Sequence, residues 1–149
     1  QRDLSTLDVD AAVAAWPDKE SLRQRVLDAH TDPQLQDQFV ELTLAKWVTP
    51  EQLRERLELL KRVWPELVVK LREQLVPAAT LQEQLRAVGA PAHPSDIDLD
   101  WDRFRQTYER CQMIRSRDTV LDLALETGLL AQLVDELFAP DGFWGRQQH

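Results

Sequence analysis

Apolar residues recur every three or four positions along most of the chain, which is the spacing of one face of an α-helix. The most regular stripe has six members at spacings of +4, +3, +4, +3 and +4, namely Leu53, Leu57, Leu60, Trp64, Leu67 and Leu71. The stripe keeps its phase across Pro65, so it predicts a long helix near residues 50–75 that is kinked at the proline rather than broken there. Such a helix suits the core of a bundle. The alternative is a coiled-coil seam between two copies, for which the stripe provides fewer than four clean heptads.

Capping residues, prolines and glycines divide the rest of the chain into further helices. Thr49 and Gln52 have the spacing of a capping box at the start of the long helix. The pattern predicts helices over about residues 8–15, 18–29, 33–46, 50–75, 77–88, 100–115, 119–127 and 129–138, with a loop at 89–98. We expect Cys111 to be buried, and Asp118 to cap the helix that follows it. No stretch alternates in the manner of a β-strand, so the sequence predicts a single all-α, multi-helix domain over residues 1–149.

Composition then excludes several classes of function. The chain has 149 residues and a formal net charge of −8, and its first glycine is Gly89. Phosphate-binding loops of the P-loop and GxGxxG types need glycines, so the first 88 residues contain neither. Cys111 is the only cysteine, which excludes an internal disulfide and a cysteine-based zinc site and predicts a reducing, cytoplasmic setting. The acidic balance disfavours nucleic acid as a partner, and no apolar run is long enough to span a membrane.

Two groups of side chains are of metal-binding type, but neither has the spacing of a metal site. The histidines lie far apart in the sequence, at His30, His93 and His149. Four acids alternate along the chain, at Asp96, Asp98, Asp100 and Asp102. Counted from the first of these acids, a calcium loop would need glycine at position 101 and glutamate at position 107, where this chain has Trp101 and Thr107. We therefore expect the acids to cap helices, and we predict no metal-binding residue.

Arginines are dense around residue 115, where a phosphate site is conceivable. Arg115 and Arg117 precede the helix expected to start at residue 119, so they could hold a phosphate together with the amides of its first turn. The alternative is that these arginines pair with Asp118, Asp122 or Glu126, or are simply solvated. Nucleophilic catalysis has no support, because no histidine lies close in the sequence to Ser116 or to the cysteine. We predict no catalytic residue in this chain.

Several stretches together resemble one known protein family. They are AVGAPAHPSDIDL at 87–99, IRSRDTVLDLALETGLL at 114–130, LFAPDGFW at 137–144, and WPEL at 64–67 with LVPAA at 75–79. In this register the chain resembles the C-terminal helical region of bacterial sn-glycerol-1-phosphate dehydrogenases. These enzymes belong to the iron-containing alcohol dehydrogenase and dehydroquinate synthase-like superfamily. The similarity extends from about residue 8 to residue 144.

The resemblance implies a parent enzyme of two domains. An N-terminal α/β domain would bind NAD(P), and a helical domain would hold a divalent metal through one aspartate and two histidines. The metal would polarise the substrate oxygen while hydride passes between the nicotinamide and glycerol 1-phosphate or dihydroxyacetone phosphate. In the family, the segments with the nucleotide and metal ligands precede the region matched here. The resemblance therefore assigns no catalytic, cofactor or metal residue to this chain.

Two functions follow as expectations. The first is the helical C-terminal portion of an NAD(P)- and metal-dependent glycerol-1-phosphate dehydrogenase-like oxidoreductase, inactive without its N-terminal nucleotide-binding domain and able to form a homo-oligomer. The absence of an initiator methionine favours a chain cut from a longer protein. The second is a non-enzymatic helical interaction module whose apolar stripe at residues 53–71 binds a partner helix.

Overall fold

The computed structural model of the chain describes residues 2–148, and these residues form helices and no β-strand. This confirms the predicted all-α class. The α-helices are α1 (Val9–Ala14), α2 (Lys19–Ala29), α3 (Pro33–Leu44), α4 (Pro50–Gln74), α5 (Ala78–Ala87), α6 (Trp101–Arg110), α7 (Val120–Glu126) and α8 (Leu130–Phe138). Short 3-10 helices are η1 (Leu4–Thr6), η2 (Pro94–Ile97), η3 (Cys111–Ile114) and η4 (Gly145–Gln147).

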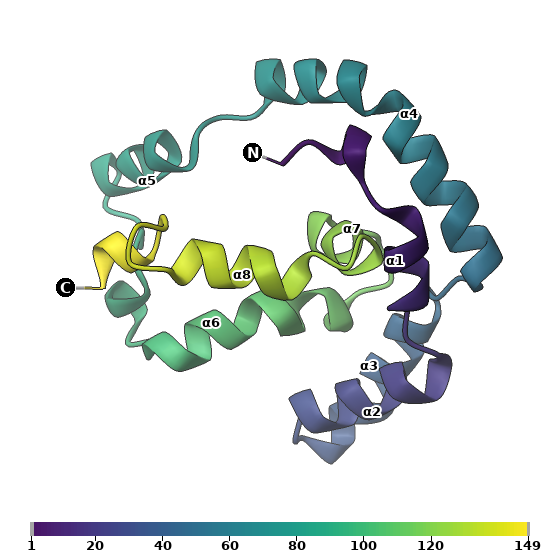
Figure 1. The fold of residues 1–149 in the computed structure, drawn as a ribbon. Coiled ribbons are helices and arrows are strands. Elements are labelled where there is room, and N and C mark those ends of the chain that lie inside the picture. Colours follow the sequence, from purple (N-terminus) through teal and green to yellow (C-terminus); the bar gives the residue numbers. More distant parts are fainter. Residues whose placement is uncertain (1, 149) are drawn as a thin grey trace.

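The helices form a layered but open arrangement. Helices α6 and α8 lie side by side, α2 packs against α3, and α4 packs against α1 and η1. Figure 1 shows α4 and α5 following one another around the edge of the molecule, with the N-terminal segment inside the curve that they make. The α2–α3 hairpin is joined to the α6–α8 part through η3, which contacts α3.

Aspartate and threonine side chains begin most of these helices, as the sequence predicts. Asp8 accepts a hydrogen bond from the Ala11 amide at 3.0 Å, and Asp18 accepts one from the Ser21 amide at 2.7 Å. The capping box of α4 is complete, because Thr49 and Gln52 each bind the backbone amide of the other. These bonds satisfy amides that have no partner within the helix.

Helix α4 continues through Pro65, and its ribbon bends, which confirms the predicted long bent helix. Its apolar stripe is buried mainly in its first half. Leu53 and Leu57 are completely buried against Val9 and Ala12 of α1. Beyond the buried Trp64 the stripe is only partly covered. The N-terminal half of α4 is therefore a core helix, and its C-terminal half is a border of the molecule.

A second core lies where α6, α7 and α8 meet, and the C-terminal segment closes it. Val134 of α8 is buried in this core, and Tyr108 and Phe138 pack around it. Trp144 returns to the same place and donates a hydrogen bond from its indole Nε1 to the Tyr108 hydroxyl at 2.6 Å. A Cβ on Gly145 would lie 1.8 Å from a backbone oxygen of the α8 C-cap, so only glycine permits this close return.

The chain departs from the predicted pattern between residues 89 and 115. The expected loop contains η2, and the helix expected over 100–115 ends at Arg110 and continues as the 3-10 helix η3. A 3-10 helix has a tighter turn than an α-helix, so it changes the direction of every following side chain. The prediction that Cys111 is buried is wrong: Cys111 is still in the α-helical register, but its side chain is exposed because no other segment of residues 2–148 covers that position. The 3-10 turn after it places Met113, whose backbone oxygen binds Thr43, in the interior. Within residues 2–148, no helix is long and apolar enough to cross a membrane.

Candidate functional site

Buried charges are concentrated where the end of α3 meets η3 and α7. The ammonium group of Lys46 lies 2.5 Å from Oδ1 of Asp122, and both side chains are over nine-tenths buried. The same ammonium donates a hydrogen bond to the backbone oxygen of Gln112. Nearby, the Thr43 hydroxyl donates to the Met113 backbone oxygen at 3.1 Å. Two polar side chains near the C-terminal end of α3 therefore hold the 3-10 segment in place.

Asp122 also begins the helix that carries it. Its Oδ2 accepts hydrogen bonds from the amide of Thr119 at 2.7 Å and from the hydroxyl of Thr119 at 2.8 Å, and the Thr119 hydroxyl accepts one from the Leu121 amide. The N-cap of α7 is thus Thr119, and the prediction that Asp118 caps this helix is wrong. Thr119 is the N-cap because the carboxylate of Asp122, three residues later, binds the Thr119 amide and completes a capping box.

Glu126 is the second buried acid of α7, one turn after Asp122. Its side chain is 7% exposed, and it forms an ion pair with Arg56 of α4. Burial raises the pKa of the Glu126 carboxyl; the guanidinium of Arg56 acts in the opposite direction, and the carboxylates of Asp118 and Asp122 add to the increase in pKa. The cluster therefore links α3, α4 and α7 through charge. It offers no nucleophile beside a base, so its chemistry is that of a structural ion-pair network.

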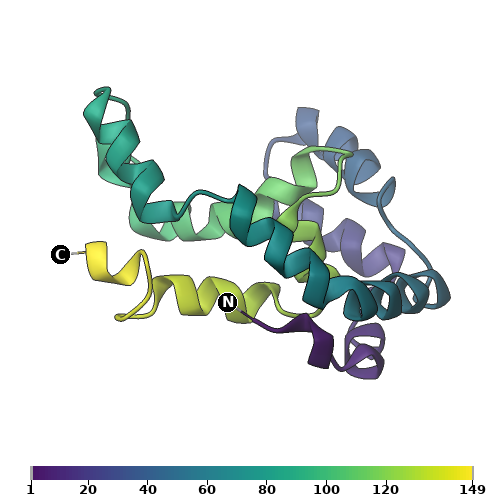
Figure 2. The ribbon, with the colours of Figure 1, turned by 90° about the horizontal axis from the view of Figure 1, so that it is seen from above.

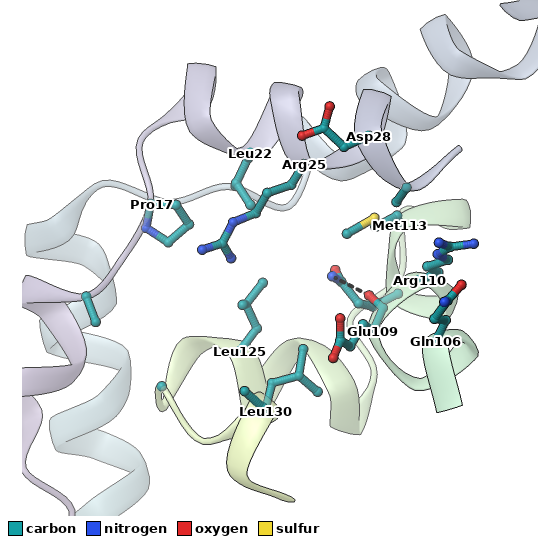
Figure 3. A pocket seen from close by; sticks show the side chains of 15 residues that line it. Pro17, Leu22, Arg25, Asp28, Gln106, Glu109, Arg110, Met113, Leu125 and Leu130 are labelled. Carbon is teal, nitrogen blue, oxygen red and sulfur yellow. Dashed lines mark hydrogen bonds between the residues drawn. The ribbon is translucent and has the colours of Figure 1, made fainter. Parts of the chain in front are cut away.

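An open pocket of about 590 Å³ lies next to this cluster, between α2 and the layer of α6, η3 and α8, and Gln112 and Leu125 are among its lining residues. Figure 3 shows Leu22 and Met113 on one side of this space and Leu125 and Leu130 on the other, with the side chain of Arg25 reaching into it. The size lies within the range of small-molecule sites. The pocket combines apolar walls with a charged rim, which suits binding rather than covalent chemistry.

One histidine lies beside the pocket, at the C-terminal end of α2. The ring of His30 packs against Phe39 at 4.7 Å between ring centroids. Burial lowers the pKa of His30, and the positive charge of Arg110 lowers it further. The imidazole is therefore biased toward its neutral form. His93, the other histidine of the described chain, stacks on Trp101 at 5.5 Å in the aromatic cluster near the C-terminus.

The residues present do not fit the metal that the resemblance implies for the parent enzyme. Among residues 2–148, no three side chains of His, Cys, Asp or Glu converge as metal ligands would. Two of the alternating acids have the capping roles expected of them: Asp96 accepts from the amides of Ala92 and His93, and Asp100 caps α6. These amides lower the pKa of Asp96, with Ala92 as the larger cause. His149 lies outside the described residues.

Arg115 and Arg117, the predicted phosphate contacts, are both exposed on the segment between η3 and α7. Among residues 2–148 neither forms an ion pair with a carboxylate. Two amides at the start of α7, those of Thr119 and Leu121, are already engaged by Asp122 and Thr119, so fewer amides are left to bind an anion. The phosphate contact stays a prediction, and it rests on the two guanidinium groups alone.

The acids of the buried cluster could be predicted from the sequence as members of ion pairs, but their partners could not. Nearby arginines were the expected partners of Asp122 and Glu126, whereas the structure pairs these acids with Lys46 and Arg56, which are 76 and 70 positions away. One signal was available, because two acids spaced i, i+4 on a short, otherwise apolar helix have to meet cations if that face is buried. No family model, curated protein or solved structure matches the chain.

Proposed function

We propose that this chain is the helical C-terminal portion of a glycerol-1-phosphate dehydrogenase-like oxidoreductase and is inactive by itself. One observation carries the proposal: three of the stretches that resemble the family, at 87–99, 114–130 and 137–144, hold distant parts of this fold together. The stretch at 114–130 supplies Asp122, which pairs with Lys46 just after α3, and Glu126, which pairs with Arg56 of α4. The stretches at 87–99 and 137–144 meet in the aromatic cluster, where the ring centroids of His93 and Trp144 are 6.3 Å apart.

This distribution is what a structural region of an enzyme requires. Residues that only build a fold are buried and paired within the chain, whereas catalytic residues converge on an open site. Here the stretches at 87–99, 114–130 and 137–144 each supply side chains that contact other parts of the chain, whereas the stretch at 75–79 is exposed. In the proposed parent, NAD(P) and the metal belong to the segments that would precede this region, and no step of the reaction is assigned to the residues described here.

The test compares two proteins under the same conditions. The 149-residue chain and the full product of the gene that encodes it are assayed for NAD(P)-dependent oxidation of glycerol 1-phosphate, with divalent metal added. We expect turnover only from the full product, whose reading frame should contain a nucleotide-binding domain before this region. Turnover by the 149-residue chain would contradict its inactivity. A full product without such a domain would contradict the parentage.

A non-enzymatic interaction module is the second candidate function. Its binding surface would differ from the one expected from the sequence. The first half of the stripe at residues 53–71 is inside the molecule and unavailable to a partner helix. Apolar exposure lies instead on the C-terminal half of α4, where Val69 is 51% exposed, on the segment after α4, where Leu75 is 66% exposed, and on α5, where Leu81 is 46% exposed. An interaction function would therefore use this edge of the molecule.

A further inference from the structure

The pocket beside α2 has charged side chains of both signs directed into it. Figure 3 shows the guanidinium group of Arg25 reaching into the space from α2, and the side chain of Glu109 lying on the side formed by α6. Within residues 2–148, neither side chain forms an ion pair or a hydrogen bond. Asp28, three positions after Arg25 on the same helix, accepts a hydrogen bond from Gln24 at 2.8 Å instead. A cation and an anion therefore share one space, and each lacks a partner in the described chain.

A buried side-chain amide lies close to Glu109. Gln112 of η3 lines the pocket and is only 2% exposed. Its side-chain nitrogen donates to the backbone oxygen of Glu109 at 3.4 Å, whereas its side-chain oxygen accepts no hydrogen bond from residues 2–148. Buried polar atoms are ordinarily hydrogen-bonded, so this oxygen is available to a donor from outside the chain. Gln112 and Glu109 thus provide acceptors on one side of the pocket, and Arg25 provides donors on the other.

Apolar side chains line the space between these polar groups. Leu22, Met113, Leu125 and Leu130 are buried or half-buried, and they form walls on two sides of the pocket. The volume of about 590 Å³ lies within the range of sites that enclose a small organic molecule. Figure 2 shows α2 beyond the N-terminal end of α8 rather than alongside it, and the pocket between them is open to solvent. The pocket can therefore take up a molecule with an apolar body directly from solution.

We propose that this pocket binds a small zwitterion in which an alkyl chain separates a carboxylate from an ammonium group. The carboxylate binds the guanidinium group of Arg25, whose planar arrangement of donors matches two carboxylate oxygens. The ammonium group donates to the carboxylate of Glu109 and to the side-chain oxygen of Gln112. The methylene groups between the two charges lie against the apolar walls and leave water, which is favourable.

The two charges of the pocket distinguish this ligand from a molecule with a single charge. An alkyl carboxylate would pair with Arg25 but would bring its apolar end to Glu109. That costs free energy, because a charge loses water without gaining a partner. An alkylamine would pair with Glu109 and leave Arg25 in the same position. This inference does not depend on the oxidoreductase proposal, because it rests on the pocket alone.

An NMR titration of the 149-residue chain tests the class of ligand. Met113 is the only methionine of the chain and lies in a wall of the pocket, so carbon-13 in the methionine methyl group gives one signal from this site. The probes are 8-aminooctanoate, octanoate and octylamine, which have similar alkyl chains and differ in their end groups. We expect 8-aminooctanoate to shift the signal saturably, with a Kd about tenfold lower than that of either other compound. No saturable shift, or a singly charged probe that binds equally well, would overturn the proposal.

Charge removal at each end of the pocket tests the orientation of the ligand. Arg25→Met should weaken binding of 8-aminooctanoate about tenfold without weakening that of octylamine, and Glu109→Gln should weaken it about tenfold without weakening that of octanoate. The matched controls are Arg23→Met on α2 and Asp102→Asn on α6, which remove the same charges from exposed positions outside the pocket. Circular dichroism should show that all four variants are folded. Equal losses of affinity in the controls would mean that net charge alone matters and would contradict the proposed contacts.

Discussion

Replacing Lys46 by methionine tests whether the buried charge cluster holds the two halves of the fold together. Methionine keeps much of the length and apolar body of the lysine side chain but removes its ammonium group. The change leaves Oδ1 of Asp122 and the backbone oxygen of Gln112 without their donor. Both members of the ion pair are buried, at 8% and 9% side-chain exposure. Solvent therefore cannot replace the lost interaction.

The expected loss of unfolding free energy is about 3–5 kcal/mol, the usual cost of removing one partner from a buried ion pair. Domains of this size have a total stability of about 5–15 kcal/mol, so the variant should be visibly destabilised. Urea unfolding followed by circular dichroism measures the loss over the whole chain. Tryptophan fluorescence alone would be unsuitable, since Trp47 is adjacent to the substituted residue.

Two comparisons separate this explanation from a general effect of removing a positive charge. Arg54→Met breaks the exposed pair of Arg54 with Asp10, and exposed pairs contribute about 1 kcal/mol or less. The Asp122→Asn variant keeps an oxygen for the Thr119 amide but leaves Lys46 unpaired. The double variant Lys46→Met with Asp122→Asn should lose less stability than the sum of the two single losses. A loss below about 1 kcal/mol for Lys46→Met, or strict additivity in the double variant, would refute the reasoning.

Three further predictions concern Glu126, the glycines and the arginines. Burial raises the pKa of Glu126 above its ordinary 4.5, so the folded chain keeps the carboxyl proton to a higher pH than the unfolded chain does. The free energy of unfolding should therefore fall as the pH rises above 4.5, and more steeply than in Glu126→Gln. Thermal unfolding between pH 4 and about 8 measures this difference. Gly145→Ala should lower the free energy of unfolding by about 1–3 kcal/mol, because the added Cβ collides with the backbone, and should expose the C-terminal segment to proteolysis. Gly89 has φ +71° and free space around it, so Gly89→Ala should lower the free energy of unfolding by about 1–2 kcal/mol and leave that segment protected. If Arg115 and Arg117 hold a phosphate, calorimetry should detect binding of glycerol 1-phosphate to the unmodified chain, and this binding should disappear when both arginines are replaced by alanine. An unmodified chain that gives no heat of binding would contradict the predicted phosphate contact.

Features that depend on neighbouring residues could be predicted from the sequence. The cap of α1 by Asp8 and the capping box of Thr49 and Gln52 are bonds between residues three positions apart. The continuity of α4 through Pro65 follows from the phase of its stripe. Each of these is decided by the local geometry of a helix, which the order of residues already contains.

Features that depend on distant residues could not be predicted. The partners of Asp122 and Glu126 come from parts of the chain that only the tertiary fold brings close. The periodicity of α5 locates its apolar residues, but it does not reveal that Leu81 and Leu85 stay exposed while Gln82 is buried against Ala92 and Gln147. Cys111 illustrates the same limit, because whether a side chain on a helix face is covered depends on which distant segments pack against that face.

Asp122 uses its two oxygens for two different purposes, and this has a consequence for how the molecule folds. One oxygen starts α7 through Thr119, and the other receives Lys46 from the far part of the chain. Helix α7 has only 7 residues, too few to persist by itself in water. The local bond to Thr119 and the long-range bond to Lys46 therefore form together, when the segment that follows α3 packs against α7. The backbone amides of α7 should exchange with solvent only when this junction opens, so a seven-residue helix reports on the cooperativity of the whole fold.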